Sequence, residues 1–180
     1  MAMSHDRGRR VKPPLDAEGL EQAALFYAGR YATTRAKLAA YLGRKVRERG
    51  WAEAQPPTIE PLVERMVALG YVDDRAFANA KAGALTRRGY GARRVGQALR
   101  AAGIAEEDGA EAREAADAGA WDAALRFAER RKIGPFAAVQ ADRPAREKAF
   151  AAMLRAGHPA SLARRIIAAR PGEIPLADTC

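Results

Sequence analysis

The residues best suited to chemistry in this sequence are the arginines around one short turn, Arg87-Arg88-Gly89-Tyr90-Gly91-Ala92-Arg93-Arg94. Guanidinium groups bind phosphate, and a helix that starts beside them adds the positive end of its dipole. Tyr90 could stack on a nucleobase, or it could cap the preceding helix as an apolar residue. Because no acidic residue occurs between Lys81 and Arg100, we expect this turn to contact a polyanion.

A second set of polar and basic residues is predicted to lie on exposed helix faces. Arg93, Gln97 and Arg100 are spaced to share the face opposite Val95 and Leu99, as in the reading helix of a helix-turn-helix protein. Ordinary surface helices show the same spacing, so both interpretations stay open. The other candidates for contact with a partner or with DNA are Arg35, Lys37, Arg44, Lys45, Arg164 and Arg165.

Residues that support catalysis or metal binding are sparse. The two histidines, His5 and His158, lie far apart and the single cysteine is Cys180, a set that does not make an ordinary zinc site. His158 precedes a proline at a predicted helix start, which favours a packing or capping role. The sequence has neither a GxxxxGK[ST] phosphate loop nor a Ser-His-Asp arrangement. We therefore expect no enzymatic activity, no cofactor and no metal.

Hydrophobic periodicity predicts nine helices and no strand. Asp73 and Asp74 follow a glycine and precede a clean helical pattern, so they are better explained as an N-cap than as a metal or acid–base pair. The predicted helices cover residues 16–29, 34–49, 58–69, 73–88, 92–102, 105–117, 121–132, 143–156 and 159–170.

Five of these helices end in a glycine that is followed by a bulkier residue. Glycine takes the left-handed position after the last turn, and the next side chain folds back on the helix. The five glycines are Gly50, Gly70, Gly89, Gly103 and Gly157. Because residues 34–42 also resemble residues 91–99, we expect three tandem repeats of three helices that form an elongated, curved body. Similar composition among alanine-rich helices is the alternative explanation.

These signals divide the chain into five segments. A basic arm over residues 1–15 is expected to be disordered and a tail over 172–180 to be flexible. The three repeats are expected over residues 16–72, 73–119 and 120–171. The residues expected to stabilise the central motif are Gly70, Asp73, Asp74, Phe77, Gly89, Gly91, Leu99 and Gly103.

Composition favours an acidic partner. The 180 residues include 31 Lys and Arg against 22 Asp and Glu, which gives a net charge of +9. Acidic residues instead predominate from 105 to 122, a segment that could face a basic partner surface or solvent. One cysteine suits a reducing compartment, and no apolar run is long enough for a secretory signal or a membrane span. We therefore expect a cytoplasmic protein.

The run from Leu62 to Ile104 resembles the central signature of the RecX regulatory proteins. The matching segments are Leu69-Gly70-Tyr71-Val72-Asp73-Asp74, Phe77-Ala78 and Arg88-Gly89-Tyr90-Gly91. A looser similarity extends from about residue 20 to residue 170. The first repeat departs from the family, because it has Tyr31-Ala32-Thr33-Thr34 where an Arg-Ser turn is common and Lys37 where a glutamate is common.

The resemblance implies an all-helical protein of three three-helix repeats whose partner is the RecA recombinase filament on single-stranded DNA. Family members are taken to lie in the groove of that filament and to suppress ATP hydrolysis, strand exchange and co-protease activity. Without the resemblance, the residues leave open a second function, a direct DNA-binding regulator of the helix-turn-helix class. That class is usually dimeric, whereas this sequence shows no heptad pattern and we expect a monomer.

Overall fold

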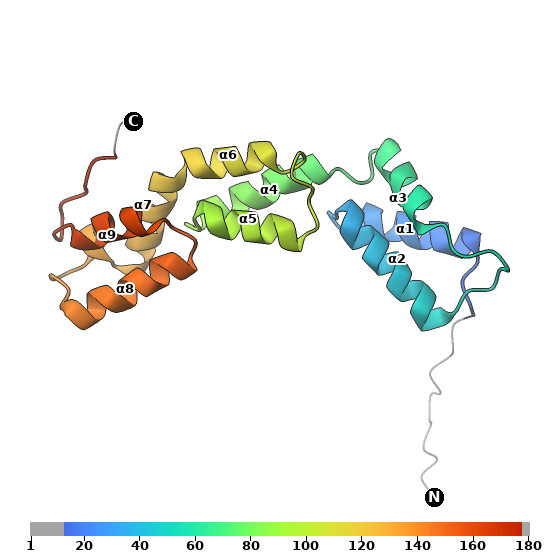
Figure 1. The fold of residues 1–180 in the computed structure, drawn as a ribbon, viewed down its shortest axis with the longest axis horizontal. Helices are drawn as coiled ribbons and strands as arrows, with labels where there is room; N and C mark the ends of the chain where they lie inside the picture. The colour runs from blue at the N-terminus through green and yellow to red at the C-terminus, as the bar shows by residue number, and fades with distance from the viewer. Residues whose placement is uncertain (1–12, 178–180) are drawn as a thin grey trace, which may run out of the picture. The chain divides into compact units, whose positions relative to one another are not determined.

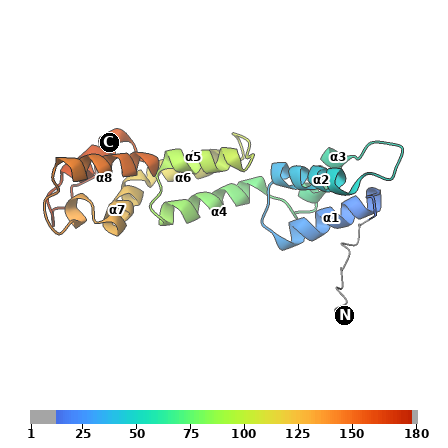
Figure 2. The same ribbon diagram turned by 90° about the horizontal axis from the view of Figure 1, so that it is seen from below.

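The computed structural model describes residues 13–177. Within this range the chain forms nine α-helices and one short 3-10 helix, η1, with no strand (Figure 1 and Figure 2). The prediction of an all-helical fold is confirmed. No helix among these residues is long and apolar enough to cross a membrane. The predicted disordered arm and flexible tail extend into residues 1–12 and 178–180, which lie outside the described range.

Two compact units make up the chain, Met1–Val72 and Asp73–Cys180. The helices of the first unit are α1 (Ala17–Arg30), α2 (Arg35–Arg49) and α3 (Ile59–Ala68). Leu38, Leu42 and Met66 are fully buried at its centre. Leu15, the last residue of the predicted arm, joins this core, and its backbone pairs with Gly50 and Ala52 in a single bridge-like contact.

The second unit contains two separate apolar clusters. Its elements are α4 (Asp74–Arg87), α5 (Ala92–Ala101), α6 (Ala110–Ala118), α7 (Ala120–Arg131), η1 (Gly134–Phe136), α8 (Arg143–Arg155) and α9 (Ala160–Ala168). Val95 and Leu99 are buried between α4, α5 and α6, whereas Met153 and Ile166 are buried among α7, α8 and α9. Each cluster thus draws on three helices, although the exact limits of the predicted repeats stay a prediction.

Side-chain capping explains where four of the described helices begin, namely α1, α2, α4 and α8. Asp73 is the N-cap of α4, and its Oδ1 accepts a hydrogen bond of 2.8 Å from the amide of Ala76. Asp74 is the first helical residue and is only 5% exposed. All five predicted cap glycines have positive φ angles, between 73° and 95°. The capping prediction is therefore confirmed at both ends of α4, where Gly89 follows the last turn.

The helix predicted over residues 105–117 starts later than expected, at Ala110. Residues 106–109 form a turn, and Gly109 occupies the N-cap position. The Arg113 guanidinium folds back over this turn, where its Nη1 donates to the carbonyl oxygen of Glu106 at 2.9 Å. Glycine inside a helix costs about 1 kcal/mol relative to alanine. The prediction was wrong because it placed Gly109 inside the helix, although glycine favours a helix boundary.

Candidate functional site: an arginine-lined cleft

The predicted arginine turn between α4 and α5 packs against the turn between α8 and α9. The amide of Gly91 donates to the carbonyl oxygen of Ala156 at 2.9 Å, and Nε2 of His158 donates to the carbonyl oxygen of Gly89 at 3.1 Å. A Cβ at Gly91 would lie 2.4 Å from the carbonyl oxygen of Gly157, closer than any side chain tolerates. The glycines of the motif therefore allow two backbones to meet, which fixes the position of α5 against α8.

A cleft of about 350 Å³ opens beside this junction and is bordered by α5, α7 and α8. Tyr90 lines it with a partly buried ring, and Phe127, which is 4% exposed, lies beneath. The arginines that line the cleft are Arg94, Arg130, Arg131 and Arg155, all of which are exposed. The structure thus gathers cations from three helices around one aromatic ring.

No acidic side chain is among the described residues that line this cleft. Among residues 13–177, no carboxylate forms an ion pair with Arg94, Arg130 or Arg155. The guanidinium of Arg131 lies over the Phe127 ring, 5.7 Å from its centroid. Like charges that line one cleft repel one another, and a bound anion relieves that repulsion. The arrangement suits bidentate binding of phosphate or carboxylate groups.

The structure divides the arginines that the sequence grouped together. Arg94 lines the cleft, and the Arg88 guanidinium lies 5.8 Å from the centroid of the Tyr90 ring. Arg87 and Arg93 are exposed but do not line the cleft. The amide of Tyr90 bonds to the carbonyl oxygen of Leu85, as expected of a helix cap. The backbone of Tyr90 therefore caps α4 and its ring borders the cleft, whereas stacking on a nucleobase stays a prediction.

The predicted polar face of α5 is exposed. Arg93, Gln97 and Arg100 lie opposite Val95 and Leu99, which are both 0% exposed. In the last cluster, the Arg164 guanidinium lies 5.2 Å from the Phe150 ring centroid. That of Arg165 lies 5.0 Å from the Trp121 ring centroid. A role for these side chains in partner binding stays a prediction.

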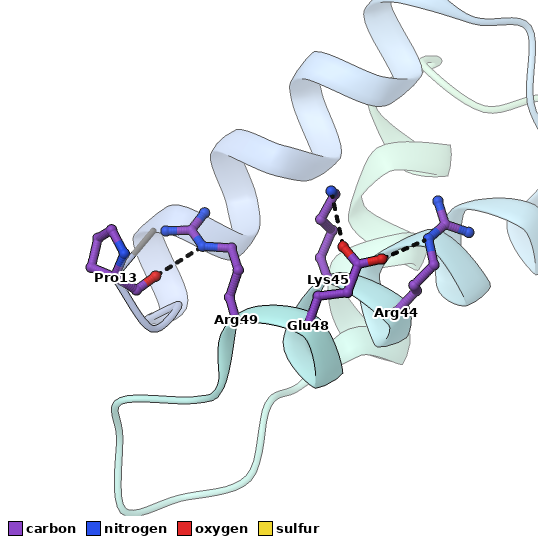
Figure 3. A network of polar contacts seen from close by, with 5 residues as sticks. All are labelled: Pro13, Arg44, Lys45, Glu48 and Arg49. Carbon is purple, nitrogen blue, oxygen red and sulfur yellow. Dashed lines mark hydrogen bonds and ion pairs between the residues drawn. The ribbon is translucent and has the colours of Figure 1, made fainter. Parts of the chain in front are cut away.

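The remaining predicted contact residues belong to the first unit. Arg44 and Lys45 both pair with Glu48, over 3.6 Å and 3.3 Å, and Arg49 beside them binds the carbonyl oxygen of Pro13 (Figure 3). Arg35 forms an ion pair of 3.4 Å with Glu64, and Lys37 is partly buried. These residues are not part of the arginine-lined cleft, because that cleft lies within the second unit.

The acidic segment is partly neutralised inside the second unit. Glu111 on α6 accepts two hydrogen bonds from Arg75 on α4, at 3.0 Å and 2.8 Å. The hydrogen bonds from Arg75 and Asn79 lower the pKa of the Glu111 carboxyl. Glu106 likewise pairs with Arg113 at 3.2 Å. Asp122 pairs with Arg126 at 4.0 Å, so several acids of this segment have partners within the chain.

Sequence reasoning missed Arg130, Arg131 and Arg155 as members of the cleft. The first two end α7 and the third ends α8. Basic residues at helix C-termini are common because they interact favourably with the helix dipole. Their position in the sequence therefore gave no reason to separate them from ordinary capping charges, and only the packing of the three helices brings them together.

Comparison with known proteins identifies the family of this chain. Residues 73–112, which contain the arginine turn, match the family model described as RecX, second three-helix domain. The Regulatory protein RecX of Myxococcus xanthus (strain DK1622) is 35% identical, in a comparison that covers 92% of this chain and 90% of that protein. This chain belongs to the RecX family.

A solved RecX structure supports the fold. The crystal structure of RecX from Lactobacillus salivarius superposes with a TM-score of 0.66 at 18% identity, covering 84% of this chain and 94% of that one. The resemblance predicted from the sequence is confirmed, as are the three-helix domains. Membership in a family of regulatory proteins also confirms the prediction that the chain is not an enzyme.

Proposed function

We propose that this protein regulates homologous recombination and DNA repair by binding the RecA filament on single-stranded DNA. In that state it inhibits RecA's ATP hydrolysis, strand exchange and co-protease activity. The observation that carries the proposal is the 35% identity to a regulatory RecX protein along nearly the whole chain. We further propose that the protein acts in the cytoplasm, where RecA filaments assemble, and that it is a monomer.

The arginine-lined cleft supports this proposal. A RecA filament presents DNA phosphates and protein carboxylates, and both are ligands for guanidinium groups. Arg94 and Arg155 come from different helices and border the same cleft without an acidic partner among the described residues. We therefore expect the cleft to supply a substantial part of the binding free energy, and we expect that contribution to weaken as salt is added.

The test is a titration of this protein into RecA that is hydrolysing ATP on single-stranded DNA. The double variant Arg94→Gln/Arg155→Gln is compared with Lys81→Gln/Arg170→Gln, which removes the same charge from exposed positions that do not line the cleft. The wild type and the control should inhibit, whereas the cleft variant should need roughly tenfold more protein because it loses charge-assisted hydrogen bonds.

Two results would contradict the proposal or its site. Equal inhibition by the cleft variant and the control would remove the cleft from the interface. No inhibition by the wild type, combined with tight and sequence-dependent binding to bare duplex DNA, would favour the direct DNA-binding regulator instead.

A further inference from the structure

A second pocket, in the first unit, is lined almost entirely by aromatic rings. Its volume is about 340 Å³, and it is bordered by residues of α1 and α2. Three of the five tyrosines of the chain meet there. The lining residues are Phe26, Tyr27, Tyr31, Tyr41 and Lys45. Aromatic residues are only 7% of the sequence, so their concentration at one surface site requires an explanation.

The rings are arranged as a stack with open sides. Tyr27 and Tyr41 are stacked, with centroids 4.1 Å apart and ring planes 15° from parallel. Tyr31 lies next to this pair, with its centroid 5.4 Å from that of Tyr27. Phe26 is 62% exposed and Tyr31 is 50% exposed. Phe26 and Tyr31 therefore present apolar ring faces to solvent. They lie beside the Tyr27–Tyr41 stack, which packs against the core of the first unit, and a further flat ring could extend this stack.

Cations surround the rings. The Arg44 guanidinium and the Lys45 ammonium lie 5.5 Å and 5.6 Å from the Tyr41 centroid, and the Arg30 guanidinium lies 5.9 Å from that of Tyr31. Glu48 pairs with the first two cations, as Figure 3 shows. Exposed ion pairs of this kind contribute little free energy, so a phosphate can replace the carboxylate. The pocket thus combines flat apolar faces with exchangeable positive charge.

We propose that this aromatic pocket binds a nucleobase of single-stranded DNA, with the neighbouring phosphates held by Arg30, Arg44 and Lys45. Base stacking on aromatic side chains beside a positively charged surface is the general way proteins hold single strands. Duplex DNA does not offer its base faces, so the pocket selects unpaired bases. The positive charge around the rings favours a nucleic acid over an apolar helix as the occupant. The proposal does not depend on the proposed RecA regulation, because it concerns contact with DNA alone.

The test measures binding of the full chain to two labelled oligonucleotides by fluorescence anisotropy, without RecA. One is an oligodeoxythymidylate of about 20 nucleotides, which exceeds the usual site size of a single-strand-binding fold. The other has the same number of phosphates but abasic sugars. The wild type should bind the base-containing strand more tightly. Phe26→Ala/Tyr31→Ala should weaken that binding roughly tenfold and leave binding to the abasic strand unchanged.

Tyr71→Ala is the matched control, because Tyr71 is 47% exposed in the same unit and does not line the pocket. It should bind both strands like the wild type. Circular dichroism checks that helix content survives in each variant. As a second measurement, Glu48→Gln should tighten binding to both strands severalfold, because it frees Arg44 and Lys45 for phosphate.

The proposal fails if the wild type binds the two strands equally or if the double variant keeps its preference for bases. The same double variant is also titrated separately into RecA that hydrolyses ATP on single-stranded DNA. Normal binding to both strands combined with lost inhibition would show that the pocket receives a protein, which also overturns the proposal. Since the oligonucleotide assay contains no RecA, its failure leaves the proposed regulatory function standing.

Discussion

His158 is the buried residue whose ionisation should affect stability most directly. Its ring is 0% exposed, and its Nδ1 has no hydrogen-bond partner among the described residues. Burial lowers the pKa of His158, while the hydrogen bond to the Gly89 carbonyl opposes that shift. The folded protein therefore favours the neutral ring more than the unfolded chain does. In the unfolded chain histidine has a pKa of about 6.5, so that state binds the additional proton as the pH falls.

We therefore expect the free energy of unfolding to be highest above about pH 6.5 and to decrease as the pH falls below that value. Urea unfolding at about pH 7.5 and about pH 5.5 measures this decrease. His158→Gln should show a smaller decrease than the wild type, and the only other histidine, His5, is present in both. An identical pH dependence in the two proteins would contradict the assignment to His158.

Adding one methyl group at Gly91 tests the close approach between the α4–α5 turn and the α8–α9 turn. The φ of Gly91 is not positive, so an alanine there is opposed by contact with the backbone of Gly157 and His158 rather than by its own conformation. We expect Gly91→Ala to lower the free energy of unfolding by about 1–3 kcal/mol through overpacking. Gly29→Ala is the control, because a Cβ at this helical position meets nothing within 4 Å. That variant should be neutral or stabilising by up to about 1 kcal/mol, and a similar loss in both variants would refute the close approach.

At the scale of the helix, burial should determine the stability loss from a truncated side chain more than the size of that side chain does. Leu99 of α5 is 0% exposed, whereas Phe77 of α4, which the sequence also placed in the central motif, is only partly buried. Leu99→Ala should cost about 2–5 kcal/mol, and Phe77→Ala should cost less than the roughly 3–5 kcal/mol typical of a fully buried ring. Chemical denaturation of the two variants measures which substitution lowers the free energy of unfolding more. A larger loss from Phe77→Ala would mean that its ring supports the core more than its exposure indicates.

The sequence predicted helices well because their end signals are local. The bounds of α4 follow from the Asp73 cap and from Gly89, and both are recognisable from neighbouring residues alone. The start of α6 was missed because the expected helix ran through Gly109, which instead occupies the N-cap position. The 3-10 helix η1 was also missed. Gly134 and Pro135 indicate a turn, but its form depends on packing against α9.

At the scale of the whole molecule, the candidate sites were predictable only in part. Arg94 and Tyr90 were recognised because they lie within one short turn. Arg130 and Arg155 belong to the same cleft, yet nothing in their spacing relates them to Arg94, because tertiary packing alone makes them neighbours. The same reason explains why Tyr31 and Tyr41 were not recognised as one pocket, since they come from different elements.

The contact between the Gly91 amide and the Ala156 carbonyl has a consequence for shortened copies of such a gene product. The family signature over residues 73–112 ends well before α8 begins. A truncated copy that stopped before α8 would keep the signature and still be recognised as a relative. It would lack Arg155 and the backbone acceptor that braces the arginine turn. A chain can therefore carry the family signature without forming the arginine-lined cleft. The cleft also requires the C-terminal cluster of helices that includes α8.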